Sequence, residues 1–266
     1  MITDKLPMLK GLILDMDGVL WHDTEPIGDL PRIIDQIRSL ELQFVFATNN
    51  STYTIAEYQQ KFAGMGVSVE PWRIVTSAES TFDYLQETSP EARTLYIFGA
   101  PSLKTSARMR GYDVLADDNE NAQPDFVIVG LDINMTYQKV STASRYIRQG
   151  ARFIATNTDA TFPTPHGLTP GSGTMVSAVQ TASGTKPISI GKPEPYLYRS
   201  AMKVMKLEPH EILCIGDRLN TDILGAQKGG FRSALVLTGV STLEDLEHWQ
   251  PKPELVAKDL ESLIYD

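Results

Sequence analysis

The sequence predicts an α/β protein built on a doubly wound parallel sheet, with a smaller α/β domain inserted into it. Four short apolar runs each stop at polar residues, as buried parallel strands do where they open into a crevice. Between the runs, apolar residues recur at helical spacing, for example at Leu30, Ile33, Ile34, Ile37 and Leu40. Strand-like runs that alternate with helical patterns predict a Rossmann-like core.

The four runs lie far apart in the chain, and each precedes a segment with reactive side chains. Ligands of open α/β sheets bind beyond the carboxyl ends of the strands, so these four ends are expected to converge on one site. The runs and the segments that follow them are 11–14 before Asp15-Met16-Asp17-Gly18, 44–47 before Thr48-Asn49-Asn50-Ser51, 188–190 before Gly191-Lys192-Pro193, and 212–215 before the segment from Gly216 to Asp222.

The residue types at these ends suit phosphoryl transfer. A phosphate monoester is anionic, so a carboxylate that attacks it needs nearby cations to offset strong like-charge repulsion. The carboxylates of Asp15, Asp17, Asp217 and Asp222 form a set of hard oxygen ligands of the kind that Mg²⁺ prefers. Lys192 supplies a second positive charge.

Donors to the phosphate oxygens are also predicted. Thr48 offers a hydroxyl, and the backbone N–H groups of Asn49 and of the Asp17-Gly18 turn can bind these oxygens as charge spreads in the transition state. Gly18 permits a tight turn beside the ligand. We assign Thr48, Asn49, Asn50 and Lys192 to the binding of the phosphate.

The two carboxylates of the first segment can have different roles. Asp15 can attack phosphorus and form an aspartyl-phosphate, while Asp17 protonates the leaving group and later activates water. The alternative for Asp17 is a side chain that caps the Gly18 turn. Asp222 lies just inside a predicted helix, where it can orient Lys192 or a metal-bound water without touching the metal.

These four segments resemble the motifs of the haloacid dehalogenase-like hydrolase superfamily. Their Thr-Asn-Asn-Ser and Gly-Lys-Pro-x-Pro forms are similar to those of its NagD-like phosphatase branch, and the resemblance extends over nearly the whole chain. It implies a Mg²⁺-dependent phosphatase in which Asp15 is the nucleophile and Asp17 the acid/base. By the same resemblance, Mg²⁺ is bound by the Asp15 carboxylate, the main-chain carbonyl of Asp17 and Asp217.

Spacing locates the inserted domain. About 30 residues separate the first motif from the second, enough for one βα unit, whereas about 140 separate the second from the third. The long gap has strand-like runs of its own at 94–98, 126–129 and 152–155. We place the core at 1–79 and 185–266 and the inserted domain at 80–184. The resemblance implies that this domain is a cap whose loops select the leaving group.

Three features of the inserted domain are candidate ligand sites. Asn157 and Asp159 follow a strand-like run much as the catalytic segments do, and they can either bind the substrate or cap a turn. The glycines of 169–174 lack the third glycine of a dinucleotide fingerprint, so an ordinary start of a helix is favoured there. His166, flanked by Pro165 and Gly167, is expected to be an exposed loop residue.

Composition excludes several classes of function. A formal net charge of −9 and a pI near 5.0 argue against nucleic-acid and anionic-membrane partners and favour a small phosphorylated metabolite. Cys214 is the single cysteine, which excludes an internal disulfide and predicts a buried thiol. No basic leader precedes a long apolar segment, so a cytoplasmic location is expected. The resemblance is also compatible with a homodimer of this chain.

Two other hypotheses also use a phosphorylated aspartate. A phosphotransferase or phosphomutase needs the same intermediate. The familiar members of that class in this superfamily carry a helical cap between the first and second motifs, and here the segment between these motifs is too short for one. A non-enzymatic binding module phosphorylated on aspartate would need neither the long insertion nor Asp17. By resemblance, nucleoside monophosphates, pyridoxal 5′-phosphate, phosphoglycolate and sugar phosphates are all candidate substrates.

Overall fold

The chain forms two compact units. The computed structural model describes residues 1–117, 119, 122–164 and 167–265, so His166 lies outside the described residues. The first unit comprises Met1–Thr48, Ile55–Val75 and Lys192–Asp266, and the second comprises Asn49–Thr54 and Thr76–Gly191. These limits differ from the expected 80–184, because the second unit begins earlier, ends later and takes in a short segment after Thr48.

A six-stranded sheet forms the centre of the first unit, in the order β15-β14-β13-β1-β4-β5. Leu14 of β1 pairs in parallel with Ile215 of β13 on one side and with Phe46 of β4 on the other. Three of the predicted strand ends are therefore neighbours at one edge, as expected. The strands are β1 (Gly11–Leu14), β4 (Gln43–Thr48), β5 (Ile74–Thr76), β13 (Ile212–Gly216), β14 (Arg232–Val236) and β15 (Leu255–Ala257).

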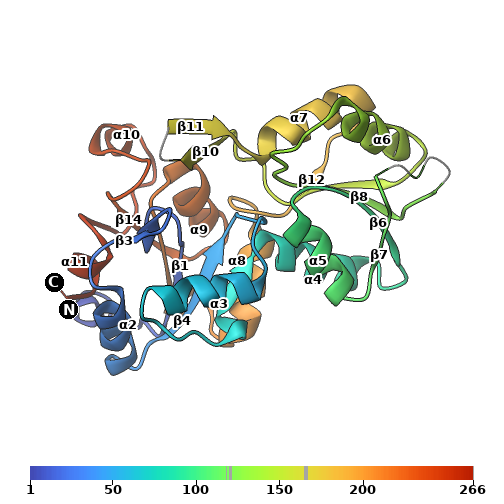
Figure 1. Cartoon of the computed structure of the whole chain (residues 1–266). Coiled ribbons are helices and arrows are strands. Elements are labelled where there is room, and N and C mark those ends of the chain that lie inside the picture. Colours follow the sequence, from blue (N-terminus) through green and yellow to red (C-terminus); the bar gives the residue numbers. More distant parts are fainter. Residues whose placement is uncertain (118, 120–121, 165–166, 266) are drawn as a thin grey trace. The chain divides into compact units, whose positions relative to one another are not determined.

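Helices pack on both faces of this sheet (Figure 1), because successive side chains of each strand point to opposite sides. On one face, Leu12 and Leu14 join a core with residues of α2 (Leu30–Ser39), α3 (Ile55–Gly64) and α11 (Leu260–Tyr265). On the other face, Ile13 packs with residues of α8 (Pro195–Met205) and α9 (Leu224–Lys228). The remaining elements are α1 (Ile2–Lys5), α10 (Leu243–Glu247), the hairpin of β2 (Trp21–His22) and β3 (Glu25–Pro26), the short 3₁₀ helices η1 (Pro71–Arg73) and η2 (Pro209–Glu211), and the π-helix η3 (Leu219–Ile223).

The second unit has its own five-stranded parallel sheet, in the order β12-β9-β8-β6-β7. Its strands β6 (Thr94–Phe98), β8 (Phe126–Val129) and β9 (Arg152–Ala155) coincide with the three runs predicted there. The other elements are β7 (Asp113–Val114), β12 (Ile188–Ser189), the hairpin of β10 (Thr161–Thr164) and β11 (Gly167–Pro170), and the helices α4 (Ser77–Thr88), α5 (Pro101–Met109), α6 (Tyr137–Arg148) and α7 (Ser172–Ser183).

One predicted strand lies in the other sheet. The run 188–190 was expected in the core sheet, but β12 pairs with β9 of the second unit, with Ile188 opposite Ile154. Both residues of β12 are only half-buried, as suits an edge strand with a neighbour on one side. The chain therefore stays in the second unit until Gly191, and Lys192 is the first residue back in the first unit.

Within the part of the chain that the structure describes, no helix combines the length and the apolar character that crossing a membrane requires.

Candidate active site

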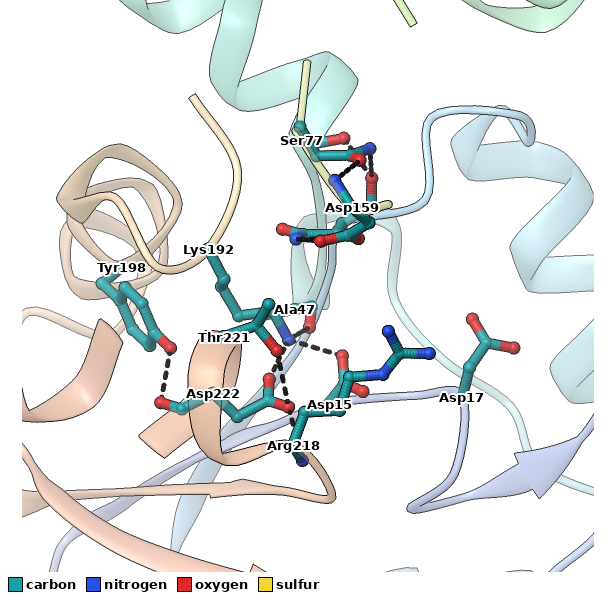
Figure 2. A network of polar contacts seen from close by, with 12 residues as sticks. Asp15, Asp17, Ala47, Ser77, Asp159, Lys192, Tyr198, Arg218, Thr221 and Asp222 are labelled. Atoms are coloured by element: carbon teal, nitrogen blue, oxygen red, sulfur yellow. Dashed lines mark hydrogen bonds and ion pairs between the residues drawn. The ribbon is translucent and has the colours of Figure 1, made fainter. Parts of the chain in front are cut away.

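Lys192 lies at the centre of a buried polar network at the carboxyl edge of the core sheet (Figure 2). Its ammonium nitrogen is 2.5 Å from Oδ1 of Asp15, 2.6 Å from Oδ1 of Asp222 and 3.0 Å from the carbonyl oxygen of Ala47. The side chain is 4% exposed. An ammonium group has three N–H donors, so these three acceptors hold it in one position.

Burial and charge act together on these side chains. Burial raises the pKa of Asp15 well above its usual value, and Asp222 and Asp217 raise it further, although Lys192 opposes the shift. Burial alone would lower the pKa of Lys192, but the carboxylates of Asp15 and Asp222 raise it. One ammonium therefore faces several carboxylates, and a second cation would be attracted to the site.

Asp217 is the carboxylate best prepared to bind such a cation. Its Oδ2 accepts a hydrogen bond from the backbone N–H of Val240 at 2.7 Å, while its Oδ1 is buried and has no hydrogen-bond partner among the described residues. Burial raises its pKa to about 6, with Asp222 adding to the shift. A Cβ on Gly239 would come within 1.9 Å of Oδ2, so the chain can pass the carboxylate here only as glycine.

The donor set fits Mg²⁺. Asp15, Asp217 and Asp222 each offer a carboxylate oxygen, and these oxygens lie within 4.8 Å of one another. Mg²⁺ takes one or two carboxylates and completes its shell with water and substrate phosphate. Asp222 is already engaged, because Lys192 binds its Oδ1 and the backbone N–H of Arg218 donates to its Oδ2 at 3.1 Å. Asp15 and Asp217 are therefore the better-placed ligands, and the contact with Lys192 supports the orienting role predicted for Asp222.

Asp17 follows Asp15 by two residues but has a different environment. It is half-buried, and its Oδ1 accepts a hydrogen bond from Nε1 of Trp21 at 2.9 Å. No backbone N–H donates to its carboxylate in the described part of the chain, so Asp17 does not cap the turn at Gly18. Gly18 has a φ of +85°, and this left-handed conformation makes the sharp turn after Asp17. Figure 2 shows the Asp17 side chain apart from the cluster of Asp15, Lys192 and Asp222.

The residues predicted to bind phosphate are divided between the two units. Thr48 ends β4 in the first unit and is buried, whereas Asn49 begins the segment 49–54 of the second unit. Nδ2 of Asn49 donates to the carboxylate of Asp159 at 3.1 and 3.2 Å. Oδ1 of Asn50 accepts from the backbone N–H and the hydroxyl of Thr52, at 2.8 and 2.7 Å. The asparagine side chains have contacts within the second unit, and their assignment to phosphate stays a prediction.

The two candidates of the inserted domain differ. Asn157 is buried, its Nδ2 donates to the carbonyl oxygen of Asn49 at 2.7 Å, and its Oδ1 accepts from the backbone N–H of Asp159 at 3.1 Å. Of the two roles left open by the sequence, these contacts favour the capping of a turn for Asn157. Asp159 is half-buried. It is the better candidate for contact with a substrate.

Several residues that contact the site carry no motif that would have identified them. The Trp21 indole binds Asp17, the hydroxyl of Tyr198 donates to the carbonyl oxygen of Asp222 at 3.0 Å, and that of Thr238 donates to the carbonyl oxygen of Gly18 at 2.6 Å. Each lies in or after an apolar segment that reads as ordinary core.

Two protein-family models and several known phosphatases match this chain. The model of a haloacid dehalogenase-like hydrolase family matches residues 12–113, and a HAD-hydrolase-like model matches residues 189–263. An acid sugar phosphatase of Staphylococcus haemolyticus is 36% identical over 255 residues, which cover 96% of this chain and 95% of that protein.

Two solved structures are also similar. NagD from Escherichia coli K-12 is 32% identical with a TM-score of 0.85, over 95% of this chain and 97% of its own. A glycerol phosphate phosphatase from Mycobacterium tuberculosis, solved in complex with magnesium, is 31% identical with a TM-score of 0.89, over 98% of this chain and 78% of its own.

The fold, the acidic site and these matches together define the class of protein as a phosphatase. The chain belongs to the haloacid dehalogenase-like hydrolase family, and within it to the NagD-like branch.

Proposed function

We propose that the protein is a Mg²⁺-dependent phosphatase that hydrolyses small phosphomonoesters through an aspartyl-phosphate on Asp15. The observation that carries the proposal is the 2.5 Å contact between Lys192 and Oδ1 of Asp15, next to the unpartnered Oδ1 of Asp217. When bound, Mg²⁺ would be held by the carboxylates of Asp15 and Asp217 and the carbonyl oxygen of Asp17, and it would offset the charge of the phosphate.

In the first step, Asp15 attacks phosphorus. Lys192 holds the carboxylate in one orientation, and one carboxylate oxygen forms the new bond to phosphorus as the bond to the leaving oxygen breaks. Lys192 also prevents rotation of the carboxylate, which keeps the attacking oxygen in line. The buried setting strengthens each of these charge interactions relative to water.

Asp17 completes the cycle by moving one proton in each direction. It donates a proton to the departing oxygen in the first step. In the second step it takes a proton from water as the water oxygen attacks phosphorus, and the bond to Asp15 breaks to release inorganic phosphate. The turn at Gly18 supports this division of labour, because it separates Asp17 from the Lys192 network.

We assign selection of the leaving group to the second unit, acting as a cap, and within it to Asp159 rather than Asn157. Asn157 is buried and uses both ends of its amide within the unit, whereas Asp159, which accepts from Nδ2 of Asn49, is half-buried. The relatives' names, an acid sugar phosphatase and a glycerol phosphate phosphatase, favour phosphate esters of sugars and polyols as substrates. A cytoplasmic location and a homodimer stay predictions, which cell fractionation and light scattering would check.

A screen of phosphorylated metabolites tests the proposal. We expect release of inorganic phosphate with Mg²⁺, no turnover after EDTA, and weaker recovery with Ca²⁺, whose larger and looser shell misplaces the phosphoryl group. Turnover in a fully demetallated sample would contradict the role of the metal. Transfer of phosphate to a second metabolite without phosphate release would favour a phosphotransferase instead.

A further inference from the structure

A buried tryptophan outside the four motifs contacts the carboxylate of Asp17. Trp21 begins β2 and is fully buried, and its Nε1 donates to Oδ1 of Asp17 at 2.9 Å. The loop between the two residues is closed by its own backbone, since the N–H of Gly18 donates to the carbonyl oxygen of Trp21 at 2.9 Å. Donor and acceptor are therefore held at opposite ends of one short, tight loop.

Helix α3 holds the indole ring in place. The ring of Phe62 meets it edge to face with centroids 5.0 Å apart, and Nζ of Lys61 lies 4.2 Å from its centroid. A cation over an indole face draws on its π electrons, which makes the ring edge, including the N–H, more positive. The orientation of Trp21 and the strength of its hydrogen bond thus both depend on α3.

The chemistry of the indole restricts how Asp17 can work. An indole N–H only donates, so Oδ1 of Asp17 is the acceptor whether or not the carboxyl group carries a proton. The unprotonated oxygen of a carboxylic acid is its stronger acceptor, so this hydrogen bond favours a proton on Oδ2. In the described part of the chain no hydrogen bond to Oδ2 is formed, so this oxygen is free to contact a leaving group.

We propose that Trp21 is a positioning residue, which fixes the carboxyl group of Asp17 so that Oδ2 delivers the proton to the leaving oxygen. The proposal rests on the phosphatase mechanism above and adds a residue outside its four motifs. It requires the hydrogen bond to matter most where the leaving group needs a proton, which separates positioning from a merely structural role.

Trp21→Phe tests this, because it keeps an aromatic ring against α3 but removes the N–H. For hydrolysis of glycerol 3-phosphate, whose alkoxide must be protonated, we expect kcat/KM to fall roughly tenfold to a hundredfold. For p-nitrophenyl phosphate, whose phenolate leaves without a proton, we expect a fall of less than about threefold. kcat/KM reports only the steps up to phosphoenzyme formation, so slower hydrolysis of the intermediate does not confuse the comparison.

Phe44→Leu is the packing control, because Phe44 lies in the same apolar core but its ring meets Phe46 rather than the indole. It should lower kcat/KM for both substrates by the same factor. Asp17→Asn should show the pattern of Trp21→Phe in stronger form. Equal losses on both substrates in Trp21→Phe would overturn the proposal, whereas absence of turnover or of a phosphoenzyme in the wild type would instead refute the proposed function.

A second variant keeps the proposal testable if the Trp21→Phe chain does not fold. Phe62→Leu removes the ring that meets the indole edge to face, so the indole keeps its N–H but loses its fixed orientation. The ratio of the two kcat/KM values should shift in the same direction as in Trp21→Phe, by roughly two- to fivefold. An unchanged ratio in Phe62→Leu would overturn the proposal by itself.

Discussion

The ammonium nitrogen of Lys192 lies 2.5 Å from Oδ1 of Asp15, although the two residues are 177 positions apart in the chain. The same nitrogen is 2.6 Å from Asp222, so one buried cation is shared by two buried carboxylates. Removing one partner of a buried ion pair leaves the other charge unpaired in a dry environment and strongly lowers the free energy of unfolding. Replacing the whole pair by apolar side chains costs much less. The contact therefore links the chemistry of Asp15 to the stability of the fold.

Lys192→Met should destabilise the first unit. Loss of the cation leaves Asp15 and Asp222 facing each other, and we expect the free energy of unfolding at pH 7.5 to fall by about 3–5 kcal/mol. Lys228→Met is a matched control, because Lys228 pairs with Glu194 on the surface, where both side chains are more than a third exposed. It should cost less than about 1 kcal/mol. Urea unfolding measures both, and equal effects would contradict this account.

The two aspartates of the first motif should fail in different ways. Asp15→Asn removes the nucleophile, so no phosphoenzyme should form with any substrate. Asp17→Asn should still bind phosphate but turn over roughly 10² to 10⁴ times more slowly, because only the proton transfers are lost. Rapid quench with labelled substrate distinguishes the two variants. Near wild-type turnover by Asp15→Asn would identify a different nucleophile.

Mg²⁺ affinity should depend on pH through Asp217. Its pKa is raised to about 6, so below that pH a proton competes with the metal, and the Kd for Mg²⁺ should rise up to about tenfold for each pH unit. Titration calorimetry between pH 5 and 7.5 measures this. Asp35→Asn, which removes an exposed carboxylate, should keep the same profile. A Kd that does not change across this range would contradict Asp217 as a ligand.

The same group should act on stability when metal is absent. The folded pKa of about 6 exceeds the usual 3.8, so the folded state holds the proton more tightly. The resulting stability is fully present below pH 3.8 and is lost as the pH rises through 6. Without metal, Asp217→Asn should therefore gain stability relative to the wild type as the pH rises from 4 to 7. If the melting temperatures of the wild type and of Asp217→Asn differed by the same amount at every pH in this range, the raised pKa of Asp217 would be contradicted.

Asp159→Ala should change which substrate is preferred more than whether phosphate is hydrolysed. The residue lies in the second unit, whereas Lys192 lies in the buried network of the first. We expect kcat/KM to change unequally across sugar, polyol and nucleotide phosphates, whereas Lys192→Ala should depress all of them together. If Asp159→Ala lowered every substrate by one factor, the residue would serve structure or general catalysis, through its contact with Asn49.

Local pattern was sufficient for much of the fold. Apolar runs that stop at a polar residue predicted β1, β4 and β13, and the runs 94–98, 126–129 and 152–155 became β6, β8 and β9 with the same bounds. Buried parallel strands are hydrophobic on both faces, so each forms a continuous apolar run whose first and last residues can be recognised in the sequence. The family motifs then indicated which strand ends carry chemistry.

The sequence by itself therefore determined the fold class, the phosphatase motifs and the residues at the strand ends, because each depends on neighbours along the chain. Only the tertiary structure decided that β12 joins the second sheet, that Asn157 holds the backbone of Asn49 across 108 positions, and that the Trp21 indole binds Asp17. A short edge strand, an amide and an indole can each satisfy their hydrogen bonds in several ways. Which partner each finds depends on packing between distant segments, and no local pattern contains that information.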